Sequence, residues 1–273
     1  MKPSDFPHGS NLATKTQGQL SAPQQAALTK VVPAYLTLYE MTRRYESSQV
    51  ELDELLNKTE AYYDLLRSPE ANCFTPQSDF VSSVLPELLC ILLRRAVSEL
   101  PSNNGLIVTA QKNIVIECNF DIADGGRIIA KRKRVDVAIL SQGSLSFNNE
   151  KIEFEIPAMC AEIKTNIDKN MLSGIESSVE TLKRTFPRTK YYAICEYSDF
   201  EIKSQNYAST GIDEIMIVRN QKRSAVRRSL NSRNLISKEL ISSFLDDIKH
   251  HLKTTARAHP NLASRLSSGR LII

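Results

Sequence analysis

The sequence predicts an α/β fold in which a mixed sheet is flanked by helices and preceded by an N-terminal helical extension. Three observations indicate this class. Apolar residues recur at helical spacing before residue 100, short extended apolar runs follow between residues 106 and 165, and helical and extended segments then alternate. The middle of the chain therefore has the order helix, three strands, helix, strand, strand, which is typical of a sheet with helices on its faces.

The first hundred residues contain no extended pattern. Residues 1–32 are rich in Ser, Thr, Gln and Pro and have little apolar periodicity, so we expect a flexible N-terminal arm. Helical spacing from Pro33 to Arg67, with Ser68-Pro69 as a stop, predicts one long helix or a helical pair within a helical extension over residues 33–78. A buried helix is expected over residues 79–100, where Pro86 either kinks the helix or marks its true first turn.

Apolar runs and turn residues predict the remaining elements. The expected strands are residues 106–110 with 114–121, 134–140, 152–165, 191–197 and 212–219, and the expected helices are 169–186 and 237–252. A turn is expected at Asp124-Gly125-Gly126, and a polar loop is expected around Gly143 and Asn148-Asn149.

The composition excludes several classes of protein. No apolar run approaches the length that spans a bilayer, and the N-terminus has neither an apolar nor an Arg-rich leader, so we expect a cytoplasmic protein. The five cysteines are widely spaced and lack a C-x-x-C motif, which indicates reduced thiols rather than disulfides or a zinc site. The four histidines lie near the two ends, which argues against a Ser-His or Cys-His hydrolase.

Positive charge is concentrated toward the C-terminus. Residues 219–273 contain 12 Lys or Arg against 3 Asp or Glu, whereas residues 35–100 contain 6 against 11. We therefore expect residues 221–273 to form a basic segment with one helix that contacts a polyanion, although a solvated basic face is the alternative. The candidate DNA contacts are Arg219, Lys222, Arg223, Arg227, Arg228 and Arg233, with the run Arg132, Lys133 and Arg134, and Lys169 and Asn170.

An acid-x-Lys triplet occurs three times, and strand alternation favours one copy. Glu162 and Lys164 end an apolar strand, on which residues two apart share a face, and the preceding apolar strand carries Asp136. Isolated buried charges are costly, so these three side chains need one another or a cation. Because the acids supply only oxygen ligands, the expected cation is Mg²⁺ and the expected chemistry is phosphodiester hydrolysis. The alternative is an ion pair that only satisfies itself.

The sequence also contains two other copies of the triplet and one further acid among apolar residues. The copy at residues 201–203 lies in a polar connector, and that at residues 247–249 lies in a helical pattern, where the two charges diverge. Glu87 lies among apolar residues in the helix over residues 79–100. It would either complete the metal shell or pair with a local Arg94 or Arg95.

These residues resemble the PD-(D/E)xK nuclease superfamily, with Val135-Asp136 in place of its PD and Glu162-Ile163-Lys164 as its ExK. More narrowly, residues 161–197 and the later IDEIMIV resemble the BbvCI-type heterodimeric Type II restriction endonucleases, over about residues 79–220. The resemblance implies a catalytic core at residues 79–220 that uses Mg²⁺ to cut one strand of a short duplex DNA site. It also implies a dimer with a related partner subunit or with a second copy.

The resemblance also implies roles for single residues. Asp136 and Glu162 would be metal ligands, with Ile163 as a further metal position, Lys164 would be the catalytic lysine, and Glu87 matches more loosely as a catalytic acid. Three alternatives stay open: a repair or structure-specific nuclease of the same superfamily, a non-catalytic DNA-binding regulator whose cluster is a structural ion network, and a helical scaffold that recruits partners.

Overall fold

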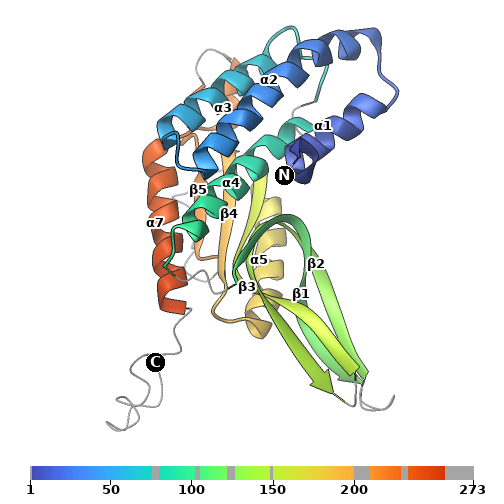
Figure 1. The fold of residues 1–273 in the computed structure, drawn as a ribbon, viewed down its shortest axis with the longest axis vertical. Coiled ribbons are helices and arrows are strands. Elements are labelled where there is room, and N and C mark those ends of the chain that lie inside the picture. Colours follow the sequence, from blue (N-terminus) through green and yellow to red (C-terminus); the bar gives the residue numbers. More distant parts are fainter. Residues whose placement is uncertain are drawn as a thin grey trace.

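A five-stranded mixed sheet with helices on both faces forms the centre of the protein (Figure 1). The computed structural model describes residues 2–75, 80–101, 105–121, 127–147, 150–199, 210–228 and 233–255. The strand order β1-β2-β3-β4-β5 and the helices around it confirm the predicted fold class. The predicted turn at residues 124–126, Asn148-Asn149 and the acid-x-Lys triplet at residues 201–203 lie outside the described residues.

The expectation of a flexible arm at residues 1–32 is wrong. A short 3₁₀ helix, η1 (Pro3–Asp5), and helix α1 (Pro7–Gln17) occupy its beginning, and α2 (Ala22–Glu46) starts within it. Phe6 and Leu12 are buried in the main hydrophobic core, so the segment is held by tertiary packing that its polar composition does not reveal.

Helices also form the rest of the N-terminal region. The predicted helical pair is present as α2 and α3 (Leu52–Arg67), but α2 begins eleven residues before Pro33, which lies inside it. The next helical segment is η2 (Phe80–Ser83) followed by α4 (Val84–Ser98), and Pro86 lies in the first turn of α4. Proline is tolerated there because the first amide groups of a helix have no intrahelical acceptor.

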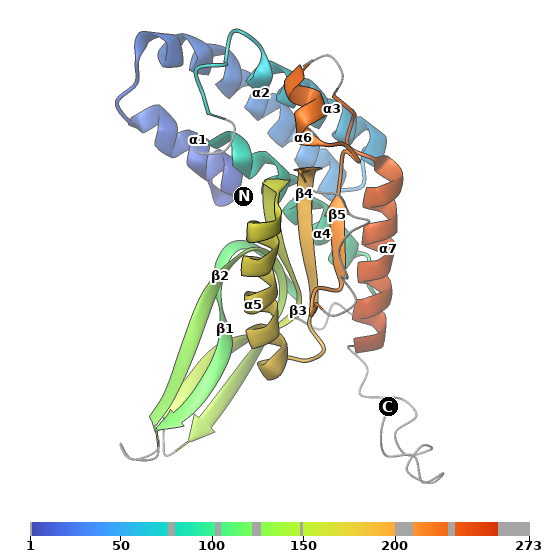
Figure 2. The same cartoon turned by 180° about the vertical axis from the view of Figure 1, so that it is seen from behind.

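Three long antiparallel strands follow, β1 (Ile107–Asp121), β2 (Arg127–Phe147) and β3 (Glu150–Ile167). The two extended segments predicted at residues 106–121 are one strand, and Gln111, the first of the three residues between them, has a φ of 52°. Gly143 lies in β2 rather than in a loop. Parts of these strands extend as an arm away from the helices (Figures 1 and 2).

The chain then crosses over to parallel strands. Helix α5 (Lys169–Thr185) connects β3 to β4 (Lys190–Ser198), which pairs with β3 in parallel, and β5 (Glu214–Ile217) pairs with β4 in parallel. The short α6 (Arg223–Arg228) and the longer α7 (Lys238–Thr255) complete the described chain. Asp168 caps α5, since its side chain accepts a bond from Met171 N.

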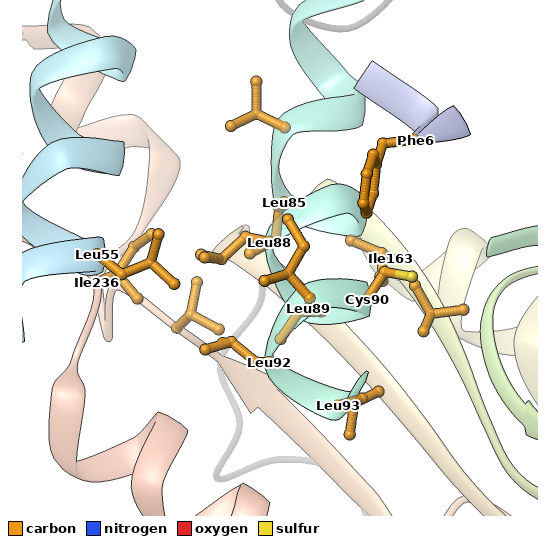
Figure 3. Packing of buried hydrophobic residues seen from close by; sticks show 14 of the residues in the cluster. Phe6, Leu55, Leu85, Leu88, Leu89, Cys90, Leu92, Leu93, Ile163 and Ile236 are labelled. Atoms are coloured by element: carbon orange, nitrogen blue, oxygen red, sulfur yellow. The ribbon is translucent and has the colours of Figure 1, made fainter. Parts of the chain in front are cut away.

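Each face of the sheet has its own core. One face packs against α4 and α7, and its core continues into α1, α2 and α3 (Figure 3). The other face packs against α5, and alternate residues such as Cys160, Ala193 and Cys195 belong to this second core. Within the described chain, no helix combines the length and the hydrophobicity that crossing a membrane requires.

Candidate active site

Asp136, Glu162 and Lys164 lie together at the point where β2 and β3 separate. Val137 pairs with Ala161 at the end of the antiparallel ladder, so Asp136 and Glu162 occupy the next position on each strand. The Asp136 Oδ2 atom accepts a 2.7 Å hydrogen bond from the backbone N–H of Ile163. This bond holds the two strands together beyond the last ladder pair and fixes the position of the Asp136 carboxylate.

The lysine contacts both acids. Lys164 Nζ donates a 2.8 Å hydrogen bond to Glu162 Oε1 and lies 3.9 Å from Asp136 Oδ2. The side chain of Glu162 is 15% exposed, that of Asp136 27% and that of Lys164 36%, so the cluster is half-buried but open to solvent on the lysine side. The predicted cluster is therefore present in the fold.

Burial and neighbouring charges shift the pKa values of Asp136 and Lys164. Desolvation and the negative charge of Glu162 raise the pKa of Asp136, against the opposing bond from Ile163 N–H. For Lys164, burial lowers the pKa, but its hydrogen bond to Glu162 and the charges of Glu162 and Asp136 outweigh burial and raise it. Lys164 is consequently a stable ammonium at neutral pH.

One carboxylate oxygen of the cluster lacks a partner. Glu162 Oε2 is buried and accepts no hydrogen bond, although a buried polar atom without a partner is costly. Such an oxygen beside a second carboxylate suits a hard cation, which prefers oxygen ligands. In the described part of the chain, no three His, Cys, Asp or Glu side chains converge, so a cation here would take two carboxylates and complete its shell with backbone, water or substrate oxygens.

Comparisons with known proteins identify the family. The family model for the Bpu10I restriction endonuclease matches residues 79–263. The chain belongs to the Bpu10I restriction endonuclease family. It is thus a Type II restriction endonuclease, as the sequence resemblance implied, and the regulator and scaffold alternatives are set aside.

The fold of this endonuclease also matches a solved structure. A structure titled native BbvCI A2B2 tetramer at low resolution aligns with a TM-score of 0.68 and 23% sequence identity, over 92% of this chain and 96% of the other. A comparison with curated proteins finds no significant match. At this identity the structural match supports the α/β fold of the endonuclease.

Glu87 lies in a different cluster from the one expected. Its Oε2 atom accepts bonds from the backbone N–H groups of His8, at 2.8 Å, and Gly9, at 3.0 Å, and its Oε1 atom accepts a 2.9 Å bond from the Tyr35 hydroxyl. Arg94 and Arg95 instead bind Glu46 and Glu99. Glu87 therefore anchors the N-terminal segment of the endonuclease, and neither expected role accounts for its contacts.

The assignment of Arg219 as a DNA contact is also wrong. Its side chain is fully buried, and it binds Glu60 Oε1 at 2.7 Å and Glu196 Oε2 at 2.9 Å. Arg233 is 8% exposed and binds Glu60 and Asp64. The acids that bind the two arginines include Glu60 and Asp64 of α3, which lie far from the basic run 219–233 in the sequence. The sequence around the arginines therefore does not indicate that they are paired. Arg219 connects α3 to β4 and the segment after β5, and Arg233 connects α3 to the segment before α7, so neither side chain faces DNA.

The other candidate DNA contacts lie on β2, in the first turn of α5 and around α6. Arg132 and Arg134 are exposed on β2, shortly before Asp136, with Arg132 Nη1 lying 3.6 Å from Glu155 and Arg134 donating to Gln111. Lys133 is partly exposed. The remaining candidates are Lys169 and Asn170, exposed in the first turn of α5, Lys222, exposed before α6, Arg223, partly exposed in α6, and Arg227 and Arg228, at the end of α6.

The sequence analysis missed one polar residue beside the cluster. Asn166 follows Glu162 and Lys164 on the same face of β3 and is buried, with its Nδ2 atom donating to Asp199 Oδ2 at 2.7 Å. Its Oδ1 atom has no hydrogen-bond partner. Continuing the period-two alternation two residues past Lys164 would have found it.

Proposed function

We propose that this chain is one subunit of a Mg²⁺-dependent Type II restriction endonuclease that hydrolyses one strand of a specific duplex DNA site. The observation that carries the proposal is the buried, unpartnered Glu162 Oε2 atom beside Asp136 and Lys164. Family membership supplies the substrate class, and the cluster supplies groups suited to phosphodiester hydrolysis.

Asp136 and Glu162 would hold the cation, with the backbone of Ile163 as a further oxygen source. Bound Mg²⁺ would acidify a water molecule and neutralise negative charge that develops on the phosphate. The hydrogen bond from Ile163 N–H keeps Asp136 oriented toward the space shared with Glu162. Lys164, as an ammonium within reach of both acids, would orient the attacking water and face the phosphate.

Basic residues near this cluster are suited to DNA binding. Arg132, Lys133 and Arg134 precede Asp136 on β2, and Lys169 and Asn170 follow β3 at the start of α5. Lys222, Arg223, Arg227 and Arg228 add positive charge around α6. We propose that these residues contact phosphates and base edges, and that Arg219 and Arg233 do not.

A partner subunit is part of the proposal. One cluster of this kind cleaves one strand, so a double-strand cut needs a second site. The similar structure is titled as an A2B2 tetramer, an assembly of two kinds of subunit, which supports a related partner or a second copy of this chain. We place the enzyme in the cytoplasm, where it would meet its DNA substrate.

The test is cleavage of supercoiled plasmid by the purified full chain with and without Mg²⁺. We expect Mg²⁺-dependent nicking by the wild type and none by Glu162→Gln, which removes the charge but keeps the shape. Glu180→Gln is the matched control, because Glu180 is an exposed acid on α5 that pairs only with Arg184 among its described contacts. Undiminished nicking by Glu162→Gln would overturn the assignment of the site.

A further inference from the structure

A second unpartnered polar atom lies beside Glu162. The Tyr191 hydroxyl on β4 is buried and, like Glu162 Oε2, has no hydrogen-bond partner. An unpaired buried hydroxyl and an unpaired buried carboxylate oxygen each carry a desolvation cost, and one hydrogen bond between them would lower both costs. A carboxylate oxygen has two lone pairs, so this bond would leave one lone pair of Glu162 Oε2 for a cation. The two atoms are a donor and an acceptor, so their chemistry is complementary.

The sheet register brings the two side chains together. In the parallel pairing of β3 with β4, Cys160 is opposite Tyr191 and Glu162 is opposite Ala193. Residues two apart on a strand share a face, so Tyr191 and Glu162 are diagonal neighbours on the face that α5 covers. The intervening Cys160 and Ala193 are small, which leaves room for the tyrosine ring to extend toward the carboxylate.

The backbone of Tyr191 is held rigidly. Its N–H donates a 2.7 Å bond to Asp213 Oδ2, and its carbonyl accepts a 2.9 Å bond from Asp213 N. Lys183 of α5 binds the same Asp213 carboxylate at 2.6 Å, which ties the helix to this point of the sheet. Burial, and then the negative charge of Glu162, raise the pKa of the Tyr191 hydroxyl, so it remains a donor at neutral pH.

We infer that Tyr191 is a positioning residue that donates a hydrogen bond to Glu162 Oε2 and orients this carboxylate for the cation. The inference rests on the proposed metal site. Glu162 is held by Lys164 at one oxygen, and the bond from Tyr191 would fix the second oxygen and the rotation of the carboxylate. Groups that orient a metal ligand in this way contribute about 10- to 100-fold to metal affinity or activity.

The test measures Mn²⁺ binding to the full chain by calorimetry. We expect Tyr191→Phe, which removes one oxygen atom, to weaken Mn²⁺ binding about 10- to 100-fold. DNA binding without metal should stay at the wild-type level. The matched control is Tyr192→Phe, because Tyr192 lies on the opposite face of β4 and its hydroxyl binds Asp247 on α7. This control should leave Mn²⁺ affinity unchanged even if it lowers stability.

A second measurement does not depend on the variants folding. In wild-type protein carrying ¹³C at the tyrosine Cζ atoms, diamagnetic Ca²⁺ should shift the Tyr191 resonance and leave that of Tyr192 in place.

The calorimetry separates the two proposals. If the wild type binds Mn²⁺ and Tyr191→Phe binds it equally well, the inference about Tyr191 is wrong and the proposed function stands. If the wild type binds no Mn²⁺, or if Glu162→Gln does not abolish its Mn²⁺ binding, the proposed metal site is wrong. The inference about Tyr191 is then wrong as well.

Discussion

Arg219 Nη1 lies 2.7 Å from Glu60 Oε1, although 159 residues separate them in the chain and both side chains are buried. This ion pair, extended by Glu196 on β4, joins helix α3 to the segment after β5. The N-terminal helices and the sheet are therefore connected by charge as well as by apolar packing.

Replacing Arg219 should destabilise the whole protein. We expect Arg219→Ala to lower the free energy of unfolding by about 3 kcal/mol, because it removes a buried partner from both carboxylates. Glu60 then keeps only Arg233 as a basic partner, and Glu196 keeps only Arg67, among the described contacts. The exposed pair of Arg184 with Glu180 gives the control, since Arg184→Ala should cost about 1 kcal/mol or less. Urea unfolding followed by circular dichroism measures both. A variant of normal stability that has lost DNA affinity would instead restore Arg219 as a DNA contact.

Adding a methyl group to Gly9 should loosen the N-terminal segment. A Cβ atom there would collide with the Pro3 carbonyl and the Tyr35 hydroxyl, so Gly9→Ala should destabilise by about 1–3 kcal/mol. Gly174 lies in helix α5, and a methyl group added there meets nothing within 4 Å. Gly174→Ala should therefore raise the free energy of unfolding by up to about 1 kcal/mol. Thermal unfolding gives both values. Equal shifts of the same sign would contradict the packing seen around Gly9.

The buried Glu87 should make stability depend on pH. Burial raises its pKa from 4.5 to about 7 in the folded protein, so the folded state binds the proton more tightly than the unfolded state. Stability from Glu87 is thus fully present below pH 4.5 and is lost as the pH rises through about 7, by on the order of 3 kcal/mol. His8, whose pKa burial lowers to about 4, has the opposite slope between about pH 4 and 6.5.

Glu87→Gln separates these two effects. The difference in the free energy of unfolding, wild type minus variant, should fall as the pH rises from 4.5 to 8, because Gln does not titrate. Urea unfolding at each pH measures this difference. A difference that is constant over this range would show that the folded protein does not perturb the Glu87 carboxyl.

Removing the Lys164 ammonium should abolish cleavage and spare DNA binding. We expect Lys164→Ala to reduce the cleavage rate about 10²- to 10⁴-fold, because it removes the ammonium that would orient the attacking water. DNA binding should stay at the wild-type level, because the acids and the phosphate contacts remain. Lys238→Ala is the control, since Lys238 is an exposed lysine that binds Asp53. Single-turnover cleavage and metal-free binding assays give the two quantities. A variant that cleaves at the wild-type rate would exclude Lys164 from the chemistry.

The arginines before Asp136 should contribute to affinity through phosphates. The double variant Arg132→Ala with Arg134→Ala should weaken binding to all duplexes and reduce the slope of log affinity against log salt by about 2, since each phosphate contact contributes about 0.9. Fluorescence anisotropy at several salt concentrations measures this slope. An unchanged slope would move the DNA surface of the endonuclease to α5 or α6.

Much of the sheet and of the candidate site could be predicted because it depends on local order in the sequence. Alternation alone places Glu162 and Lys164 on one face of β3, and the N-cap Asp168 and the apolar spacing define α5. Asp136 was predicted to be near them because consecutive strands usually pair. The three side chains do lie together, and their roles remain proposals.

Contacts between distant segments could not be predicted in this way. Glu87 in α4 is 79 residues from His8, and only the folded chain shows that its carboxylate binds the N-terminal backbone. Composition indicated that the first 32 residues would be flexible, yet Phe6 and Leu12 pack into the core. A few apolar side chains and one buried acceptor are enough to order a segment whose average composition is polar.

The sequence by itself determined the α/β class, the order of the elements and the charged cluster on β2 and β3, because these follow from periodicity and nearest-neighbour pairing along the chain. Only the tertiary structure decided that Arg219 is buried with Glu60, that Glu87 holds the N-terminus and that Tyr191 lies beside Glu162. Charge and polarity identify the groups that need partners, but the partner itself is set by which distant segments the fold brings into contact.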